Sequence, residues 1–408
     1  MTTRLWTGRV VALLGIVLLA LSLRSAVSAI SPIIAEIGRD IELSSVGVGV
    51  IGALPPVFFA LAGLVAPRIA HKLGLELSIS LAIGLIVIGH LARGFAGSYA
   101  TLLIGSSVAL AGMGVANVLL PPAVKRYFPD RIGTITAGYA TLMSISTALP
   151  AMSAAPIADS YGWRVSLGIW SLTAAIAMVP WLVLLARHRR SIVDAAPEVV
   201  EAPPALLHRM WRSRTAWAIA IAFAVSSINA YSMFAWLPQI LAQTADVSHV
   251  AAGSLLALYS FVAVPASIIA PILVVRLRHP GWIIQVGVGF FVLGYAGLLL
   301  APAAAPWLWV ALAGLGPILF PVCLVLINLR TQSQRASAAL SGFVQGIGYT
   351  LGALGPLLVG ILHDLSGGWS VPILFLLAVG LVGIVSGISL SRPRFVEQDL
   401  ARSQAAGS

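Results

Sequence analysis

The residue in this sequence that is best placed to bind a charged ligand is Arg24. It is the one charged residue in an apolar run that begins at Val10 and continues to Glu36. On a helix that rises about 1.5 Å per residue, Arg24 would lie roughly 20 Å from Arg9, within a hydrocarbon layer about 30 Å thick. A guanidinium at that depth is costly unless it faces a polar cavity. The sequence therefore predicts that Arg24 binds a negative or strongly polar group, and snorkelling to the outer head groups is the alternative.

Uncharged hydrogen-bonding side chains in other apolar runs could complete such a site. An arginine among amides and phenols suits a compact anion held by charge-assisted hydrogen bonds. For each of these side chains, a hydrogen bond between helices is the alternative role. We expect the substrate-binding residues to be Arg24, Asn117, Tyr139, Asn229, Tyr231, Tyr259, Gln345 and Tyr349. Asn117 and Asn229 rank highest, since a buried amide without partners is costly.

Nothing in the sequence predicts catalysis, a metal site or a cofactor. The one cysteine, Cys323, lies in an apolar run, so we expect neither a disulfide nor a cysteine-based metal site. No nucleophile elbow, zinc motif or nucleotide fingerprint is present. A glycine series is not followed by the Lys-Ser/Thr of a phosphate-binding loop, and we expect it to allow close helix packing. These glycines are Gly346, Gly348, Gly352 and Gly355.

The elements that must position these residues are membrane-spanning helices. Of the 408 residues, 59% are hydrophobic and 9% are charged, whereas a soluble domain is about 25% charged. Twelve hydrophobic runs approach or exceed the roughly 20 residues that a spanning helix needs. They are 10–32, 44–67, 75–91, 100–124, 132–158, 165–186, 215–241, 250–275, 282–301, 306–329, 336–362 and 371–390. We expect an all-α integral membrane protein.

The distribution of lysine and arginine predicts the orientation of these spans. With the N-terminus inside the cell, twenty of the 24 basic residues fall in inner segments and three in outer loops. This bias favours a cytoplasmic location for both termini. It also accounts for the net charge of +11, because such residues set topology and contact lipid head groups. The lipid bilayer is thus an expected partner, and nucleic acid is not.

Two landmarks suggest that the chain is an internal repeat. The segment Leu110–Gly114 resembles Leu312–Gly316, 202 residues later. The segment Asp159–Trp163 resembles Asp364–Trp369, which follows it at a similar distance along the chain. Two repeated six-helix halves are typical of secondary transporters, which bind their substrate near the membrane midplane. We expect halves at 1–186 and 215–391, a cytoplasmic linker at 187–214 and a cytoplasmic tail at 392–408.

Several longer motifs resemble the major facilitator superfamily and, within it, the cyanate and nitroimidazole transporter family. The residues that carry the likeness are Leu23–Ala26 with Ser31-Pro32, Asn117–Pro121 with Val124–Arg126, Ala235–Pro238, and Ser341–Tyr349 with Gly355-Pro356, His363-Asp364 and Trp369. The resemblance implies a monomeric transporter in the cell inner membrane that works by alternating access. Its cargo would be a small anionic or polar solute such as cyanate. The alternative is export of nitroaromatic or drug-like compounds.

The acidic residues argue against coupling through an embedded carboxylate. All thirteen Asp and Glu residues are expected in loops, tails or helix ends, whereas proton-driven transporters often place an acid within a span. His90 lies in a span near Arg93, where we expect a half-exposed interfacial side chain, with proton coupling as the alternative. A membrane-embedded enzyme or receptor is the competing class, but the spans offer no catalytic cluster.

Overall fold

The computed structural model describes residues 9–188, 204–277 and 279–405, and within these ranges the chain is helical and contains no strand. Twelve helical segments are long and apolar enough to cross a membrane. The predicted all-α fold with twelve spans is therefore confirmed. The chain forms two compact units, which are described separately. The first comprises Met1–Gly47, Val57–Val199 and Ser248–Ala257, and the second comprises Val48–Pro56, Val200–Val247 and Leu258–Ser408.

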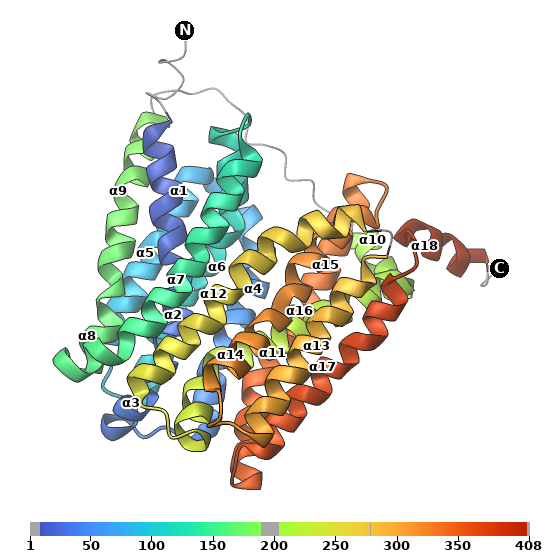
Figure 1. Ribbon diagram of the computed structural model, residues 1–408. Coiled ribbons are helices and arrows are strands. Elements are labelled where there is room, and N and C mark those ends of the chain that lie inside the picture. Colours follow the sequence, from blue (N-terminus) through green and yellow to red (C-terminus); the bar gives the residue numbers. More distant parts are fainter. Residues whose placement is uncertain (1–8, 189–203, 278, 406–408) are drawn as a thin grey trace. The chain divides into compact units, whose positions relative to one another are not determined.

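Within residues 9–188 and within residues 204–277 and 279–405, the helices follow one another with short connections (Figure 1). Those of the first six spans are α1 (Val10–Ser22), α2 (Ser25–Ser28), η1 (Ser31–Ile33), α3 (Ile34–Asp40), α4 (Ser45–Leu73), α5 (Leu75–Gly94), α6 (Tyr99–Tyr127), α7 (Ile132–Tyr161), α8 (Trp163–Gly168) and α9 (Trp170–His188). Those of the last six spans are α11 (Arg214–Thr244), α12 (His249–Arg276), α13 (Gly281–Leu300), α14 (Pro306–Leu315), η3 (Gly316–Ile318), α15 (Leu319–Leu329), α16 (Gln334–Ser366) and α17 (Ser370–Leu390).

The same neighbour relations recur inside the two units. In the first unit α5 packs against α6 and α9, and α1 packs against α9 and α7; α1 and α9 are seen side by side in Figure 1. In the second unit α13 packs against α14 and α17, and α11 packs against α17 and α16. A Cβ at Gly89 of α5 would overlap the backbone of Ala109, and one at Gly294 of α13 would overlap that of Ala313. Corresponding helix pairs thus approach closely through corresponding glycines.

The glycine series of α16 faces α11 over most of its length. A side chain at Gly348 would overlap Phe223, one at Gly352 would overlap Ser227, and one at Gly355 would meet Ser232. The expectation of close packing is confirmed at these three positions. Gly346 has no heavy atom of a neighbouring element within 4 Å of a Cβ placed there, so the expectation was wrong at that position.

The first span is interrupted, which the sequence did not predict. Instead of one helix over 10–32, α1 ends at Ser22, a single turn follows as α2, and η1 and α3 carry the span on to Asp40. Arg24 stands at the break with φ −129° and ψ −3°, outside the helical region. The interruption is not caused by a residue that disrupts helices, because Leu23 and Arg24 fill it. Contacts from neighbouring helices must therefore replace the missing turn.

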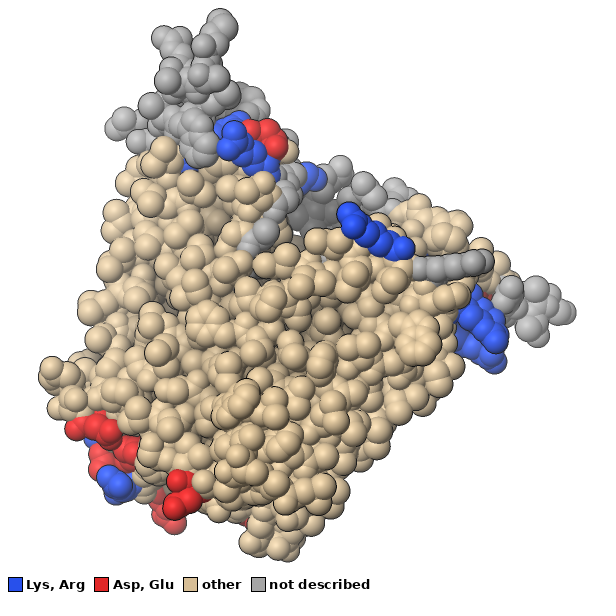
Figure 2. Space-filling view, in the orientation of Figure 1, with Lys and Arg blue, Asp and Glu red and all other residues tan. Residues whose placement is uncertain are grey.

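Charged residues are confined to the ends of the helices on the face shown in Figure 2, and an uncharged band separates these ends. Many large apolar side chains are exposed along the spans, among them Leu64, Leu172, Val385 and Ile388. A soluble protein would bury such side chains, whereas lipid accepts them. The surface therefore suits a bilayer.

Two further helices flank the spans of the second unit. In the segment predicted as a linker, α10 (Pro204–Arg209) and η2 (Met210–Arg212) lead into α11, while residues 189–203 lie outside the described residues. In the segment predicted as a tail, α18 (Val396–Ala405) packs against α11. Asp399 Oδ2 accepts hydrogen bonds from Ser213 Oγ (3.0 Å) and from the backbone amide of Thr215 (2.9 Å). The tail helix thus supplies an acidic cap to the seventh span.

Candidate functional site around Arg24

The guanidinium of Arg24 has no partner of opposite charge among the described residues. Its side chain is half-buried, and among the described residues it makes no ion pair and no side-chain hydrogen bond. The guanidinium carbon lies 4.8 Å from the ring centroid of Phe59 in α4, a cation–π contact. A ring face holds the charge without consuming any of its five N–H donors. The arrangement therefore leaves Arg24 available to bind an acceptor.

The break that presents Arg24 is held in place by two neighbouring helices. The backbone amide of Arg24 donates to Ser146 Oγ of α7 (3.0 Å), and Ser28 Oγ donates to the carbonyl of Thr147 (2.7 Å). Ser25 Oγ lies 3.0 Å from Nε2 of His90 in α5. These contacts replace helical hydrogen bonds, so the backbone at Arg24 is fixed although its helix is interrupted.

His90 is a buried structural residue and not the half-exposed one that we expected. It is 0% exposed, and its Nδ1 lies 3.2 Å from the carbonyl of Leu167 in α8. Both ring nitrogens are thus engaged, one by Ser25 and one by α8. The ring is covered because α8, the first part of the sixth span, packs against α5, and sequence spacing carries no sign of that packing.

The other two candidates of the first unit lie on helices that contact the break. Asn117 of α6 is half-buried and its amide forms no hydrogen bond with a described residue. Tyr139 of α7 is half-buried and hydrogen-bonds to Thr136 one turn earlier. Both helices pack against α2. The structure records no direct contact of either side chain with Arg24.

Asn229, in the second unit, is occupied by neighbouring protein groups. It is 0% exposed; its Nδ2 donates to the carbonyl of Val225 (2.8 Å), and its Oδ1 accepts from the hydroxyl of Tyr295 in α13 (2.7 Å). This geometry is that of a hydrogen bond between helices, the alternative that the sequence left open. Tyr295 had not been singled out because it lies in an otherwise apolar span.

The remaining candidates of the second unit are aromatic or amide groups within the bundle. The rings of Tyr231 in α11 and Tyr349 in α16 meet edge to face with centroids 6.4 Å apart, and both residues are buried. Gln345 Nε2 donates to Ser341 Oγ one turn earlier (2.7 Å). Tyr259 of α12 is 2% exposed, packs edge-on against Phe234, and its hydroxyl has no partner among the described residues. The structure thus brings Tyr231 and Tyr349 together but records no contact between Gln345 and Tyr259.

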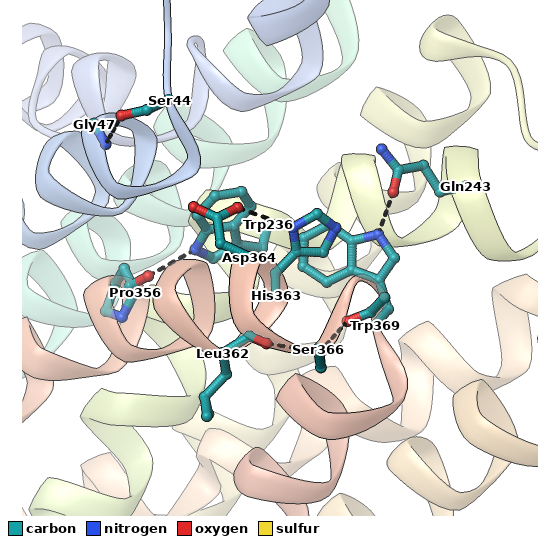
Figure 3. A network of polar contacts seen from close by, with 11 residues as sticks. Ser44, Gly47, Trp236, Gln243, Pro356, Leu362, His363, Asp364, Ser366 and Trp369 are labelled. Atoms are coloured by element: carbon teal, nitrogen blue, oxygen red, sulfur yellow. Dashed lines mark hydrogen bonds and ion pairs between the residues drawn. The ribbon is translucent and has the colours of Figure 1, made fainter.

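The motif residues at the ends of α11 and α16 form a polar and aromatic network (Figure 3). The indole of Trp236 donates to the carbonyl of Pro356 (2.8 Å), and that of Trp369 donates to Oε1 of Gln243 (2.6 Å). The ring of Trp369 lies 4.2 Å from that of His363 and 5.5 Å from that of Trp236. These motif residues therefore fasten α11 to α16 and to the start of α17.

One acidic side chain is buried in the first unit at the start of a span. Glu76, the second residue of α5, is 1% exposed. Its Oε1 accepts the hydroxyl of Tyr127 (2.5 Å) and lies 3.4 Å from Arg126. In the extended first span, Asp40 accepts from Arg164 (2.6 Å). Among the described residues the acids lie in loops, in the tail or near helix ends, as expected, and Glu76 shows that a helix end can be fully enclosed. Asp194, Glu198 and Glu201 lie outside the described residues.

Arg93 has a fully buried guanidinium, which the sequence did not single out as a candidate ligand-binding group. It is 0% exposed, and its three side-chain nitrogens have no hydrogen-bond partner among the described residues. Among those residues, no group of three or more His, Cys, Asp or Glu side chains could hold a metal ion. The buried guanidinium of Arg93 is therefore left without a carboxylate partner among the described residues, unlike that of Arg126, which lies 3.4 Å from Glu76.

The helices and their packing define a twelve-span membrane transporter. The profile of the Major Facilitator Superfamily matches residues 13–316, and the chain belongs to this superfamily. It is similar to the uncharacterised transporter YycB of Bacillus subtilis, 30% identical with 96% of each chain covered. It is also similar to the 2-nitroimidazole transporter of Escherichia coli, 30% identical with 95% of this chain and 97% of the other covered. The resemblance to the cyanate and nitroimidazole transporter family is confirmed.

Two more distant similarities agree with this assignment. The cyanate transport protein CynX of Escherichia coli is 25% identical, with 88% of this chain and 91% of that protein covered. The crystal structure of a bacterial homologue of the human lysosomal transporter Spinster superposes with a TM-score of 0.74 at 16% identity, covering 98% and 99% of the two chains. The latter shows the fold alone. The protein is thus a secondary transporter of small substrates.

Proposed function

We propose that this transporter moves a small anionic or strongly polar solute by alternating access, with Arg24 as its principal binding group. The observation that carries the proposal is the guanidinium of Arg24, which is held over Phe59 at a helix break without a counter-ion among the described residues. A guanidinium with free donors binds carboxylate-like or nitro-like oxygen atoms in a planar fork. Asn117, on a helix that packs beside the break, would add a neutral donor.

The named relatives support this substrate class. One relative is a cyanate transport protein and another is a 2-nitroimidazole transporter. Both names refer to compounds with electron-rich groups that an arginine can hold. Export of a nitroaromatic compound is the second candidate, because one relative is a 2-nitroimidazole transporter and a nitro group offers two oxygen atoms to a guanidinium.

The remaining expectations stay part of this proposal. We infer a monomer in the cell inner membrane, with both termini in the cytoplasm because basic residues concentrate in the inner segments. The halves would be 1–186 and 215–391, joined by the linker 187–214 and followed by the tail 392–408. Tyr139, Asn229, Tyr231, Tyr259, Gln345 and Tyr349 remain candidates for contacts made during the transport cycle.

A ligand screen on the purified protein tests the proposal. Cyanate, small carboxylates, 2-nitroimidazole and lipophilic cations would be added singly, and the apparent melting temperature measured, since a ligand that binds the folded state raises it. We expect the anions or the nitro compound to stabilise the protein and to be taken up by proteoliposomes. Stabilisation by lipophilic cations alone, unchanged in Arg24→Ala, would contradict the proposal.

A further inference from the structure

A pocket lies in the second unit between the beginning of α11 and the end of α17, far along the chain from Arg24. Its volume is about 260 Å³. The residues that matter to the argument are Trp211, Arg212, Arg214, Trp217, Val385 and Ser386. The pocket combines two basic side chains, two indoles and an apolar wall at the point where two spans end. Tryptophan and arginine are enriched at the level of lipid head groups.

The aromatic wall of this pocket is rigidly built. The indole of Trp217 donates to the carbonyl of Trp211 (3.0 Å), and the two rings pack edge to face with centroids 5.3 Å apart. Phe343 of α16 meets both rings at 5.4 Å. Three rings in mutual edge-to-face contact hold one another in place, so the wall keeps its shape without a ligand.

The polar groups of the pocket are available to a ligand. Arg212 and Arg214 are exposed and form no ion pair with a described residue. Ser386 is 1% exposed, and its hydroxyl has no hydrogen-bond partner among the described residues. A buried hydroxyl without a partner is costly, and a phosphate oxygen would satisfy it. Two guanidiniums and one unsatisfied hydroxyl therefore line the same pocket.

The helix terminus beside the pocket is already satisfied and does not itself make the site. Ser213 Oγ accepts the amide of Ala216, and Asp399 Oδ2 accepts the amide of Thr215 and the hydroxyl of Ser213. The carboxylate of Asp399, which caps this terminus, is thus engaged by hydrogen-bond donors. An anion in the pocket would be held by the side chains of Arg212 and Arg214.

We propose that this pocket binds the head group of an anionic phospholipid. The phosphate would lie between Arg212 and Arg214 within reach of Ser386, with the indoles at the level of the glycerol backbone. An acyl chain would follow the apolar wall past Val385, which is 66% exposed. A free phosphate ion would use the arginines but not the apolar wall, so the mixed lining favours a lipid.

Binding of defined lipids to the purified full-length protein tests this proposal. Phosphatidylglycerol, phosphatidylcholine and inorganic phosphate would be titrated separately, with native mass spectrometry and the apparent melting temperature as readouts. We expect phosphatidylglycerol to bind and stabilise, and the other two to do neither. In the double variant Arg212→Ala/Arg214→Ala, affinity for phosphatidylglycerol should fall about 25-fold. Both side chains are exposed, so this variant should fold normally.

Two further variants separate the pocket from general surface charge. Arg276→Ala removes an exposed arginine at the end of α12 that does not line the pocket, and its lipid affinity should equal that of the wild type. Ser386→Ala should weaken binding several-fold. Equal binding of phosphatidylcholine and phosphatidylglycerol, equal protection by inorganic phosphate, or an equal loss in Arg276→Ala would each overturn the proposal.

Discussion

Polar residues are used in opposite ways in the two units. In the first unit, Arg24 stands at a helix break with its guanidinium over Phe59 and with no acid beside it among the described residues. In the second unit, the amide of Asn229 is satisfied on both sides by Val225 and Tyr295. Both residues lie within apolar runs and were candidates for ligand binding, Arg24 as the principal one and Asn229 with a hydrogen bond between helices as its alternative role. The difference shows that burial of a polar residue does not by itself indicate function. A polar residue whose hydrogen-bonding groups lack protein partners is the better indicator.

The largest effect on transport is expected from removing the guanidinium of Arg24. Arg24→Ala should reduce transport by about 10- to 150-fold, because a hydrogen bond to a charged group contributes about 1.5–3 kcal/mol. Arg24→Lys should also lose most activity, since an ammonium cannot reproduce the planar fork. Initial uptake rates in proteoliposomes would measure both. The control is Arg39→Ala, which removes an exposed arginine of α3 and should transport normally; near-normal uptake by Arg24→Ala would refute the role.

The second expectation concerns the satisfied amide. Asn229→Ala leaves the hydroxyl of Tyr295 without its acceptor, so it should lower the free energy of unfolding by about 1–3 kcal/mol. Transport per folded molecule should change little if the amide only joins α11 to α13. The double variant Asn229→Ala/Tyr295→Phe should lose less free energy of unfolding than the sum of the losses in the two single variants, because it leaves neither partner unsatisfied. If substrate affinity instead fell without loss of stability, Asn229 would be a ligand contact. The difference between Asn229 and Arg24 would then disappear.

A smaller effect is expected at the buried acid. In Glu76→Gln the hydroxyl of Tyr127 can still donate, but Arg126 loses a negative neighbour at 3.4 Å. The free energy of unfolding should fall by about 1–2 kcal/mol. The dependence of transport on an imposed pH gradient should be retained, which would be measured by uptake at several external pH values. Loss of proton-driven accumulation with exchange left intact would instead make Glu76 a coupling residue.

The smallest effect is expected at the ring beneath Arg24. Phe59→Leu keeps the apolar volume but removes the cation–π contact, which is worth about 0.5–1 kcal/mol when partly exposed. Substrate affinity should fall by about two- to fivefold, because the guanidinium becomes less fixed. Phe59→Tyr keeps a ring face and serves as the matched control. An unchanged affinity in Phe59→Leu, measured by ligand titration, would show that the ring does not orient Arg24.

The sequence predicted the spans because a spanning helix needs an uninterrupted apolar run, and each run is visible by itself. It also predicted the isolation of Arg24, since no other charge occurs nearby in the same run. The break at Arg24 could not be predicted, because it depends on Ser146 and Thr147 of another helix and not on a local Pro or Gly. Local composition carries no record of a partner 122 residues away.

The second property that the sequence did not reveal is which partner each polar or charged side chain contacts. Phe59 lies in an apolar stretch with no polar feature, yet it is the residue under the guanidinium. Tyr295 satisfies Asn229 from a helix 66 residues further on. His90 was expected at the interface, and the structure encloses it because Ser25 and the carbonyl of Leu167 both meet its ring. In each case the sequence predicted the helix. It did not predict the rotation of the helix about its axis, which brings the two side chains together.

The interruption of the first span also affects how fast its backbone amides exchange with water. The amide of Arg24 is protected by a single bond to Ser146, whereas most amides of the continuous helix α9 belong to a cooperative ladder that lacks a donor only at Pro180. Opening one such bond requires far less free energy than unfolding a helix. Deuterium should therefore enter the centre of the first span sooner than it enters α9. A ligand bound to Arg24 would slow this exchange. Ligand binding could therefore be detected as slower deuterium uptake by the backbone amides around the break.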